Sequence, residues 1–209
     1  MGLFDFFKKT RAVEKETDQI KLSNIARNST LADEIRKAAV EKLTDQNELA
    51  YIVKEYEVEC GQYDVREAAL NKLTDQRLLC DIAKTKMGDY WRIEAAKKIT
   101  DNALAQEAYV AIVKNAFTGD CVMEALKKLT DQKALAEIAM NEKDKYIREK
   151  VITKLTDQEV LTNIINGSEQ NYLYTWNETI RYDEENHYDK TYTLDLRETA
   201  RKRLTQLKR

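Results

Sequence analysis

Apolar residues recur along the chain at helical spacing within short segments. The segment that follows Asp45 has apolar side chains at Leu49, Ile52 and Val53, with polar residues between them. The same three positions return as Leu79, Ile82 and Ala83, and as Leu135, Ile138 and Ala139. Apolar positions three and four residues apart lie on one face of a helix. The pattern therefore predicts a short amphipathic helix in each segment, which we name helix A.

A second amphipathic segment follows each helix A. An apolar residue followed by arginine stands eight positions before the Leu or Ile that ends the segment, at Ile35-Arg36, Val65-Arg66, Trp91-Arg92, Ile147-Arg148 and Leu196-Arg197. Alanine follows four residues after the apolar position, at Ala39, Ala69, Ala95 and Ala125. Small residues at this spacing allow two helices to cross closely. These segments are predicted to form a second helix, helix B.

One short motif recurs directly before each helix A. Thr-Asp-Gln begins at Thr17, Thr44, Thr74, Thr130 and Thr156, and Thr-Asp-Asn begins at Thr100. Successive Thr residues are 27, 30, 26, 30 and 26 positions apart. A period of this size is typical of solenoids, in which each unit buries its apolar face against a neighbour. We expect an all-α solenoid of about six helix pairs over residues 17–209, with residues 1–16 as a capping half-unit.

Acidic residues mark where the helices begin. The Asp of each Thr-Asp-Gln can accept hydrogen bonds from first-turn amides, a cap that contributes about 0.5 to 2 kcal/mol. Glu48, three residues after Asp45, is expected to complete a capping box there. A second set of residues is predicted to cap the B helices: Asp33, Asp64, Asp89, Asp120, Asp144 and Asp195.

The repeat resembles a known family. Asp64-Val65-Arg66-Glu67-Ala68-Ala69, followed by Leu73 and Asp75, is similar to the short HEAT-like repeat of bilin lyases and of many uncharacterised bacterial proteins. The resemblance covers about residues 17–206. It implies a structural ladder between an Arg on each helix B and the Asp of the inter-helix turn. The implied partners are Arg36, Arg66, Arg92, Arg148 and Arg197 with Asp45, Asp75, Asp101, Asp131 and Asp157.

The last unit contains an insertion at about residues 168–194. The step from helix A to helix B is nine residues in three units but thirty-two in the last, between Ile164 and Leu196. Aromatic and β-branched residues flank a polar segment at 183–186, which predicts a β-hairpin. Its candidate protein-binding residues are Tyr172, Tyr174, Trp176, Tyr182, His187, Tyr188 and Tyr192. Either the hairpin binds a partner, or it folds back with its acidic residues on the basic segment 197–209 and caps the last repeat.

Two further surfaces have competing interpretations. A basic residue precedes the final apolar residue of each helix B, at Lys42, Lys72, Lys98, Lys128, Lys154 and Arg203. This column is expected to be a solvated edge, because lysine is favoured in a last helical turn, although it could bind phosphate groups. Near the start of the chain, Leu3, Phe4, Phe6 and Phe7 are expected to cover the open end of the core; the alternative is a membrane-surface anchor.

The composition limits which classes of function, cofactor and cellular location we expect. The net charge is −2, which offers no general attraction to nucleic acid. One histidine, with Cys60, Cys80 and Cys121 outside any paired spacing, predicts reduced thiols and no metal or other cofactor. No apolar run reaches the roughly 20 residues needed to cross a bilayer, and the first residues do not resemble a secretory signal. The expected compartment is the cytoplasm.

These observations favour a non-enzymatic protein. We expect a protein–protein interaction or scaffold module that uses a concave helix B surface and the aromatic insertion, because Tyr and Trp are frequent at binding hot spots. The partner would be another protein, whose identity the sequence does not indicate. The alternative is a HEAT-fold nucleic-acid-binding protein or DNA glycosylase-like enzyme, with Trp91 or Trp176 beside an Asp. A bilin lyase-like role follows from the resemblance alone.

Overall fold

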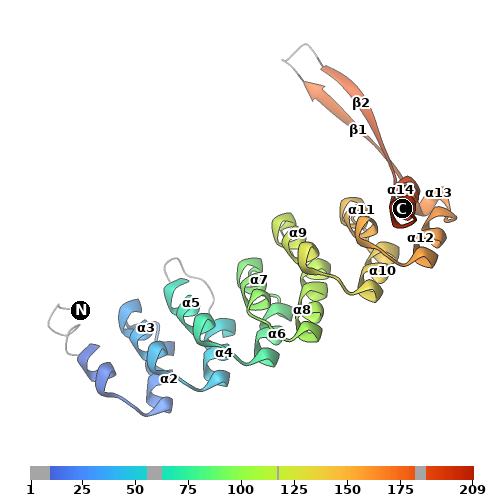
Figure 1. Ribbon diagram of the computed structural model, residues 1–209. Coiled ribbons are helices and arrows are strands. Elements are labelled where there is room, and N and C mark those ends of the chain that lie inside the picture. The colour runs from blue at the N-terminus through green and yellow to red at the C-terminus, as the bar shows by residue number, and fades with distance from the viewer. Residues whose placement is uncertain (1–9, 56–62, 117, 182–186) are drawn as a thin grey trace. The chain divides into compact units, whose positions relative to one another are not determined.

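The chain is mostly helical, and consecutive helices pack against one another. A computed structural model describes residues 10–55, 63–116, 118–181 and 187–209 (Figure 1). It divides into two compact units, Met1–Ala125 and Leu126–Arg209, which we call the N-terminal and C-terminal units. Helix α9 (Gly119–Lys128) contains the boundary. The predicted residues Leu3, Phe4, Phe6 and Phe7 lie outside the described part.

In the N-terminal unit, helices alternate between two rows (Figure 1). Helix A of each pair occupies one row: α2 (Gln19–Arg27), α4 (Gln46–Glu55), α6 (Gln76–Lys84) and α8 (Asn102–Asn115). Helix B occupies the other: α3 (Asp33–Lys42), α5 (Tyr63–Lys72) and α7 (Asp89–Lys97), preceded by a helical segment at 10–15. Both periodic patterns thus mark helices, as predicted.

The C-terminal unit adds two strands to its helices. Its helices are α10 (Gln132–Asn141), α11 (Lys145–Lys154), α12 (Gln158–Ile165), α13 (Glu169–Tyr172) and α14 (Leu196–Leu207). Between α13 and α14, β1 (Leu173–Arg181) pairs antiparallel with β2 (His187–Asp195). The predicted turn at 183–186 lies outside the described residues. Helix α14 packs against α11 and α12 and so takes the place of helix B in the last pair.

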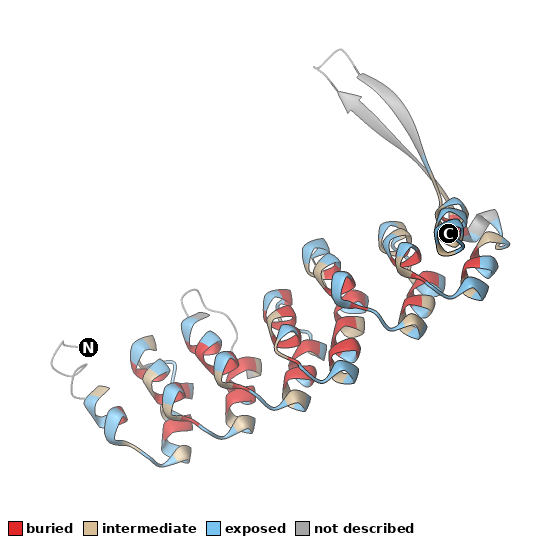
Figure 2. Cartoon of the chain, viewed as in Figure 1, coloured by how far each residue is buried: buried red, intermediate tan, exposed pale blue. Residues whose placement is uncertain are grey.

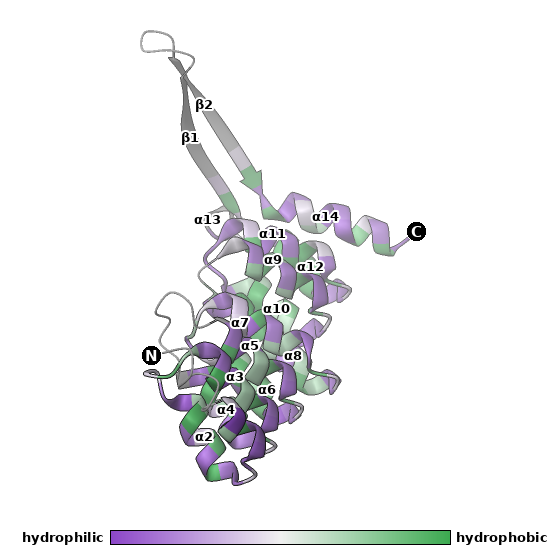
Figure 3. Ribbon diagram, turned by 90° about the vertical axis from the view of Figure 1, so that its left-hand side faces the viewer, coloured by the Kyte–Doolittle hydropathy of each residue, from purple (hydrophilic) through white to green (hydrophobic). Residues whose placement is uncertain are grey.

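The core lies between the two rows of helices within each unit (Figure 2). The Leu before each Thr-Asp is fully buried at Leu43, Leu73, Leu129 and Leu155. Trp91 is only 4% exposed, which confirms that it belongs to the core. Hydrophilic and hydrophobic residues alternate along each helix (Figure 3), as amphipathic packing requires.

The Asp of the repeated motif caps helix A throughout. At α6, Asp75 Oδ1 accepts hydrogen bonds from the amides of Arg77 at 2.9 Å and Leu78 at 3.0 Å. Side-chain caps of this kind are also formed by Asp18, Asp45, Asp101, Asp131 and Asp157. These predicted caps are confirmed. The capping box at Asp45 is wrong, because the Glu48 carboxylate accepts instead from Ser23 Oγ on the neighbouring α2.

The predicted caps of the B helices are right in two cases. Asp144 and Asp195 accept from the first amides of α11 and α14. At α3 and α7 the N-cap residues are Ala32 and Gly88, which form no side-chain cap. The carboxylates inside the first turns bind arginine instead: Asp33 binds Arg36 and Asp89 binds Arg92. Asp64 and Asp120 likewise lie inside the first turns of α5 and α9.

The Gln of the motif links one turn to the next, a role the sequence did not indicate. Gln46 Oε1 accepts from the Thr74 amide at 2.8 Å, from Thr74 Oγ1 at 3.2 Å and from the Asp75 amide at 3.1 Å. Equivalent bonds join Gln19 to Thr44, Gln76 to Thr100 and Asp101, and Gln132 to Thr156. Because the Thr and Asp amides belong to the turn before helix A, the bridge holds neighbouring pairs in register.

Candidate protein-interaction site

The arginine of helix B binds the ends of A helices. Arg92 is 0% exposed; its Nε donates to Ala83 O of α6 at 3.0 Å. On α8, its Nη2 donates to Ala111 O at 3.0 Å and its Nη1 to Asn115 O at 3.1 Å. The last carbonyls of a helix have no partner within that helix, and the planar guanidinium can reach several of them. Arg92 therefore joins α6, α7 and α8.

The arginine–aspartate ladder implied by the family resemblance is consequently wrong. Arg36 Nε donates to Ala26 O at 3.0 Å, and Arg148 Nε donates to Ala139 O at 2.9 Å, so both bind the carbonyl end of the preceding helix A. Arg197 binds Asp195 at 2.8 Å, rather than Asp157. The aspartates of the inter-helix turns cap helices.

Arg148 on α11 binds residues of the insertion as well as the end of α10. Its Nη1 donates to Asn171 O at 2.8 Å and to Tyr174 Oη at 2.6 Å. The guanidinium carbon also lies 4.8 Å from the centre of the Tyr172 ring, a cation–π contact. Tyr172 is 4% exposed. We call Arg148, Asn171, Tyr172 and Tyr174 the anchor, because their contacts join the start of β1 to α11.

Gly167 leaves space for the ring of Tyr172. A Cβ atom at Gly167 would stand 2.1 Å from Cε2 and 2.6 Å from Cδ2 of Tyr172. No side chain fits at that distance, so the Tyr172 ring lies directly against the backbone of Gly167. The Tyr172 hydroxyl donates to Met140 Sδ on α10 at 3.3 Å. The first predicted binding residue, Tyr172, is therefore a structural residue of the anchor.

Beyond the anchor, the register of the strands sorts residues onto two faces. Residues directly opposite each other in an antiparallel pair lie on the same face, and every second residue along a strand shares it. One face holds Tyr174 opposite Leu194, Trp176 opposite Tyr192, Glu178 opposite Lys190 and Ile180 opposite Tyr188. We call it the aromatic face. The strands extend away from the helices of this unit (Figure 1).

The other face is polar. It holds Leu173 opposite Asp195, Thr175 opposite Thr193, Asn177 opposite Thr191, Thr179 opposite Asp189 and Arg181 opposite His187. The register thus brings together four of the predicted binding residues, Tyr174, Trp176, Tyr188 and Tyr192. It places His187 on the polar face. Tyr182 lies outside the described residues.

The far end of the insertion is tied to α14. Asp195 caps this helix through the Arg197 amide at 2.9 Å and binds the Arg197 guanidinium at 2.8 Å. Its hydrogen bond with the Arg197 side chain lowers the pKa of Asp195. Arg203 Nε donates to Leu155 O at 2.8 Å, so α14 is bonded to the end of α11. Helix α14 packs against α11 and α12.

Several lysines of the basic column also bond to a neighbouring helix, which the sequence did not indicate. Lys98 Nζ donates to Asn71 O at 2.8 Å, and Lys154 Nζ donates to Lys127 O at 3.2 Å. Lys42 and Lys72 reach Glu14 O and Glu41 O in the same way. Each acceptor lies at the carbonyl end of the preceding helix B. Burial lowers the pKa of Lys98 and of Lys154.

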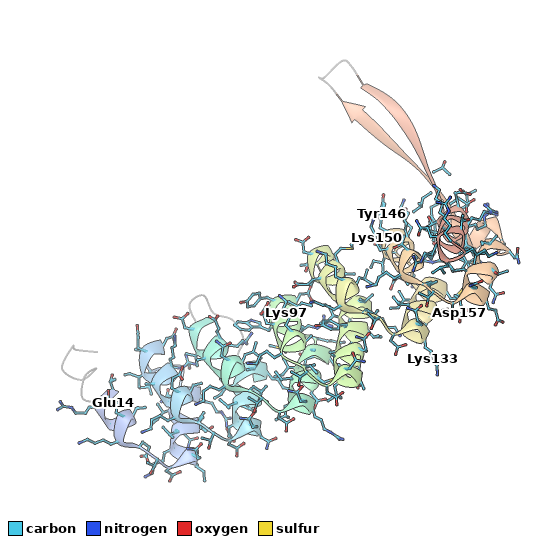
Figure 4. The ribbon with its side chains drawn as sticks, in the orientation of Figure 1. Glu14, Lys97, Lys133, Tyr146, Lys150 and Asp157 are labelled. Carbon is cyan, nitrogen blue, oxygen red and sulfur yellow. The ribbon has the colours of Figure 1, made fainter. Side chains whose placement is uncertain are left out.

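The exposed surface of the B helices carries scattered aromatic and charged groups. Tyr90 on α7 is 52% exposed. Tyr146 on α11 is 51% exposed (Figure 4). Lys97 donates to Glu94 at 2.8 Å and lies 2.7 Å from Glu124, and these two hydrogen bonds raise the pKa of Lys97. The helix B surface within each unit thus offers single tyrosines among ion pairs.

Other candidate chemistry has little support. Asp89 near Trp91 is buried and accepts from Arg92 and from the Thr118 amide at 2.7 Å, so this pair is not an exposed carboxylate beside an aromatic ring. Burial raises the pKa of Cys80, whereas Cys60 lies outside the described residues. Within the described ranges, no group of three or more His, Cys, Asp or Glu side chains is placed to hold a metal ion. No helix in those ranges is long and apolar enough to cross a membrane.

Comparisons with known proteins found no match for the chain. No family model matches it, and neither a curated protein nor a solved structure does.

Two residues of the site were not identified as such from the sequence. Arg148 was assigned to the implied ladder, and Gly167 received no role. The equivalence of Arg148 with Arg92 was visible in the periodic pattern, but the pattern does not show where a long side chain ends. The spacing of Gly167 from Tyr172 is local and follows no repeat.

Proposed function

We propose that the protein is a non-enzymatic protein–protein interaction or scaffold module. In this proposal the helix pairs form an α-solenoid of HEAT-like repeats, and another protein binds the aromatic face together with the surface of the B helices. The observation that carries the proposal is the strand register, which gathers Tyr174, Trp176, Tyr188 and Tyr192 on one face of a pair that extends from the helices. Large aromatic residues grouped in this way are typical of binding hot spots.

The anchor supports the proposal because it limits the motion of the strand pair at its base. Arg148 binds Asn171 and Tyr174 at the start of β1, and Asp195 at the end of β2 caps α14. Both strands therefore continue from residues with defined partners in the helices. A binding element that is held at both ends loses less conformational freedom on association than a loose loop does.

The polar repeat residues argue against a nucleic-acid interface on the helices. Lys98 and Lys154 donate to backbone carbonyls of neighbouring helices, and Arg92 is fully buried. A phosphate group would have to compete with these bonds for the same donors. The residues that recur with the period are thus accounted for by structure, which leaves the strand pair as the distinctive surface.

Paired substitutions on the two faces test the proposal. We would purify tagged chains, capture proteins from the source cell and identify them by mass spectrometry. The variant Trp176→Ala with Tyr192→Ala removes one directly opposed pair from the aromatic face and should lose the captured partner. The matched control, Thr175→Ala with Thr193→Ala, alters the adjacent pair on the polar face and should keep it. Equal capture by both variants would refute the proposal.

A further inference from the structure

The two B helices of the C-terminal unit differ in charge from the other B helices. Helix α11 contains four basic residues and one acidic residue, and α14 contains the same numbers of each. The helices α3, α5, α7 and α9 each contain equal numbers of basic and acidic residues. Because α11 and α14 pack against each other, the excess positive charge of the B helices is concentrated in this one pair.

Several of these basic side chains have partners within the chain. Arg148 is buried and binds backbone carbonyls. Lys154 and Arg203 each donate to a carbonyl at the end of the preceding helix B. Arg201 lies 3.4 Å from Glu198 on its own helix. These four basic side chains therefore take part in the structure of the unit.

Two lysines of the same helices are placed differently. Lys150 on α11 and Lys202 on α14 are exposed, and neither has a hydrogen-bond or ion-pair partner among the described residues. Each stands two residues after a buried residue, Arg148 or Ala200, which is about 200° around a helix. Each lysine thus lies on the side of its helix opposite the core. We call this outer side of α11 and α14 the basic surface.

The dimensions of the basic surface limit what can bind it. Helix α11 has ten residues and α14 has twelve, so the two are about 15 and 18 Å long. An extended peptide advances about 3.3 Å per residue, so roughly five or six residues cover that length. Double-stranded DNA carries about one charge per 1.7 Å and presents about ten phosphates over the same distance, far more than two free lysines can neutralise. A short acidic peptide therefore matches the surface better than a nucleic acid does.

We propose that the basic surface binds a short acidic segment of a partner protein, whose carboxylates pair with Lys150 and Lys202. This inference rests on the proposed function, because it names the chemistry of the partner that the B helices bind. The excess positive charge of α11 and α14 also attracts an acidic segment before contact is made. Ion pairs at an exposed surface are individually weak, so a short peptide on its own should dissociate readily.

Fluorescence anisotropy of a labelled hexaglutamate peptide measures this binding. The full chain would be titrated from about 1 µM to about 1 mM at a salt concentration of about 0.01 M, and again at about 0.1 M. The wild type should bind with a dissociation constant on the order of 0.1 to 1 mM at the lower salt concentration and several-fold more weakly at the higher one. Hexaglutamine with the same label should not bind.

Charge reversal locates the site. Lys150→Glu combined with Lys202→Glu should raise the dissociation constant at least about fivefold, because attraction is replaced by repulsion. The matched control combines Lys37→Glu on α3 with Lys133→Glu on α10, both of which are exposed (Lys133 and Lys150 are labelled in Figure 4). Both double variants change the net charge equally, so the control should stay within about twofold of the wild type if the effect is local. Far-ultraviolet circular dichroism would verify that each variant is folded.

Three results would overturn this inference: no binding of hexaglutamate by the wild type, equal losses in the two double variants, or tighter binding of labelled hexathymidylate than of hexaglutamate. The last result would assign the basic surface to nucleic acid instead.

The proposed function fails separately from this inference. If hexaglutamate does not bind, but partner capture is still lost in the Trp176→Ala, Tyr192→Ala variant, the acidic segment is rejected and binding of a protein by the aromatic face is retained. If hexaglutamate binds at the basic surface, but that variant captures its partner as the wild type does, the role of the aromatic face is rejected and the acidic segment is retained.

Discussion

Replacing Arg92 with methionine should be among the most destabilising single changes on a B helix. Its guanidinium donates to Ala83 O, Ala111 O and Asn115 O at 3.0 to 3.1 Å and to Asp89 at 3.2 Å. Methionine fills part of the volume but leaves these acceptors without their donor. Removing one partner of a buried ion pair typically costs about 3 to 5 kcal/mol. We expect Arg92→Met to lower the free energy of unfolding by that amount.

Arg27→Met provides the matched control. The Arg27 side chain is 41% exposed, lies 3.9 Å from Glu48 and stacks on Tyr51 at 4.0 Å. Exposed pairs of this kind contribute about 0 to 1 kcal/mol, because water screens the charges. Arg92→Lys should fall between the two methionine variants, since lysine keeps the charge but loses the planar set of donors.

Urea unfolding measures the difference through the fluorescence of Trp91. The chain has two tryptophans, so a Trp176→Phe background leaves the buried Trp91 as the sole reporter. Because Arg92 is adjacent to Trp91, the fluorescence of Trp91 reports unfolding of the region that the Arg92 substitutions affect. A loss below about 1 kcal/mol for Arg92→Met, or equal losses for Arg92→Met and Arg27→Met, would refute the role assigned to the buried guanidinium.

Three smaller perturbations test single contacts. Asp75→Ala should lower the free energy of unfolding by about 0.5 to 2 kcal/mol through loss of the α6 cap, and Asp75→Asn should cost little; equal costs in urea would contradict capping. Gly167→Ala should cost about 1 to 3 kcal/mol because its Cβ meets Tyr172, whereas Gly119→Ala, with nothing within 4 Å, should be near neutral; the same urea assay distinguishes them. The hydrogen bond with Arg197 lowers the pKa of Asp195 in the folded chain. The stability that wild type has over Asp195→Asn should therefore be complete above the ordinary pKa of Asp, about 3.9, and should disappear as the pH falls through the lowered pKa. A stability difference between the two chains that does not depend on pH would contradict this.

The helices and their starts could be predicted from sequence because both depend on local spacing. Apolar periodicity identified the segments, and an Asp after Thr marked each helix A start. The acidic residues of the B helices were harder to interpret. Asp33 and Asp144 both precede an apolar-Arg pair, yet Asp144 caps α11 and Asp33 binds Arg36. Helix α3 begins at Asp33 itself, whereas α11 begins one residue after Asp144. This difference determines whether the carboxylate binds arginine or caps the helix.

The contacts of long polar side chains could not be predicted in the same way. The period showed that Lys98 is equivalent to Lys154, and Gln46 to Gln76. It did not show that these side chains reach across to a neighbouring pair, because such contacts depend on how closely the helices stack. For the insertion, spacing located the extra residues, and composition predicted strands on either side of 183–186. The structure has them at Leu173–Arg181 and His187–Asp195. The short helix α13 and the anchor contacts of Arg148 carry no compositional signal.

The central claim is that the strand pair binds and the helices support it. The most direct test replaces residues 175–193 with Asn-Gly, a two-residue turn suited to the opposed ends Tyr174 and Leu194. This change leaves Tyr174 in the anchor and Asp195 at the start of α14. We would measure the melting temperature and partner capture of the shortened chain.

If the claim is correct, the melting temperature should stay within about 4 °C of the wild-type value, because no helix contact of the anchor is removed, and capture should be abolished. Capture at the wild-type level by the shortened chain would contradict the claim.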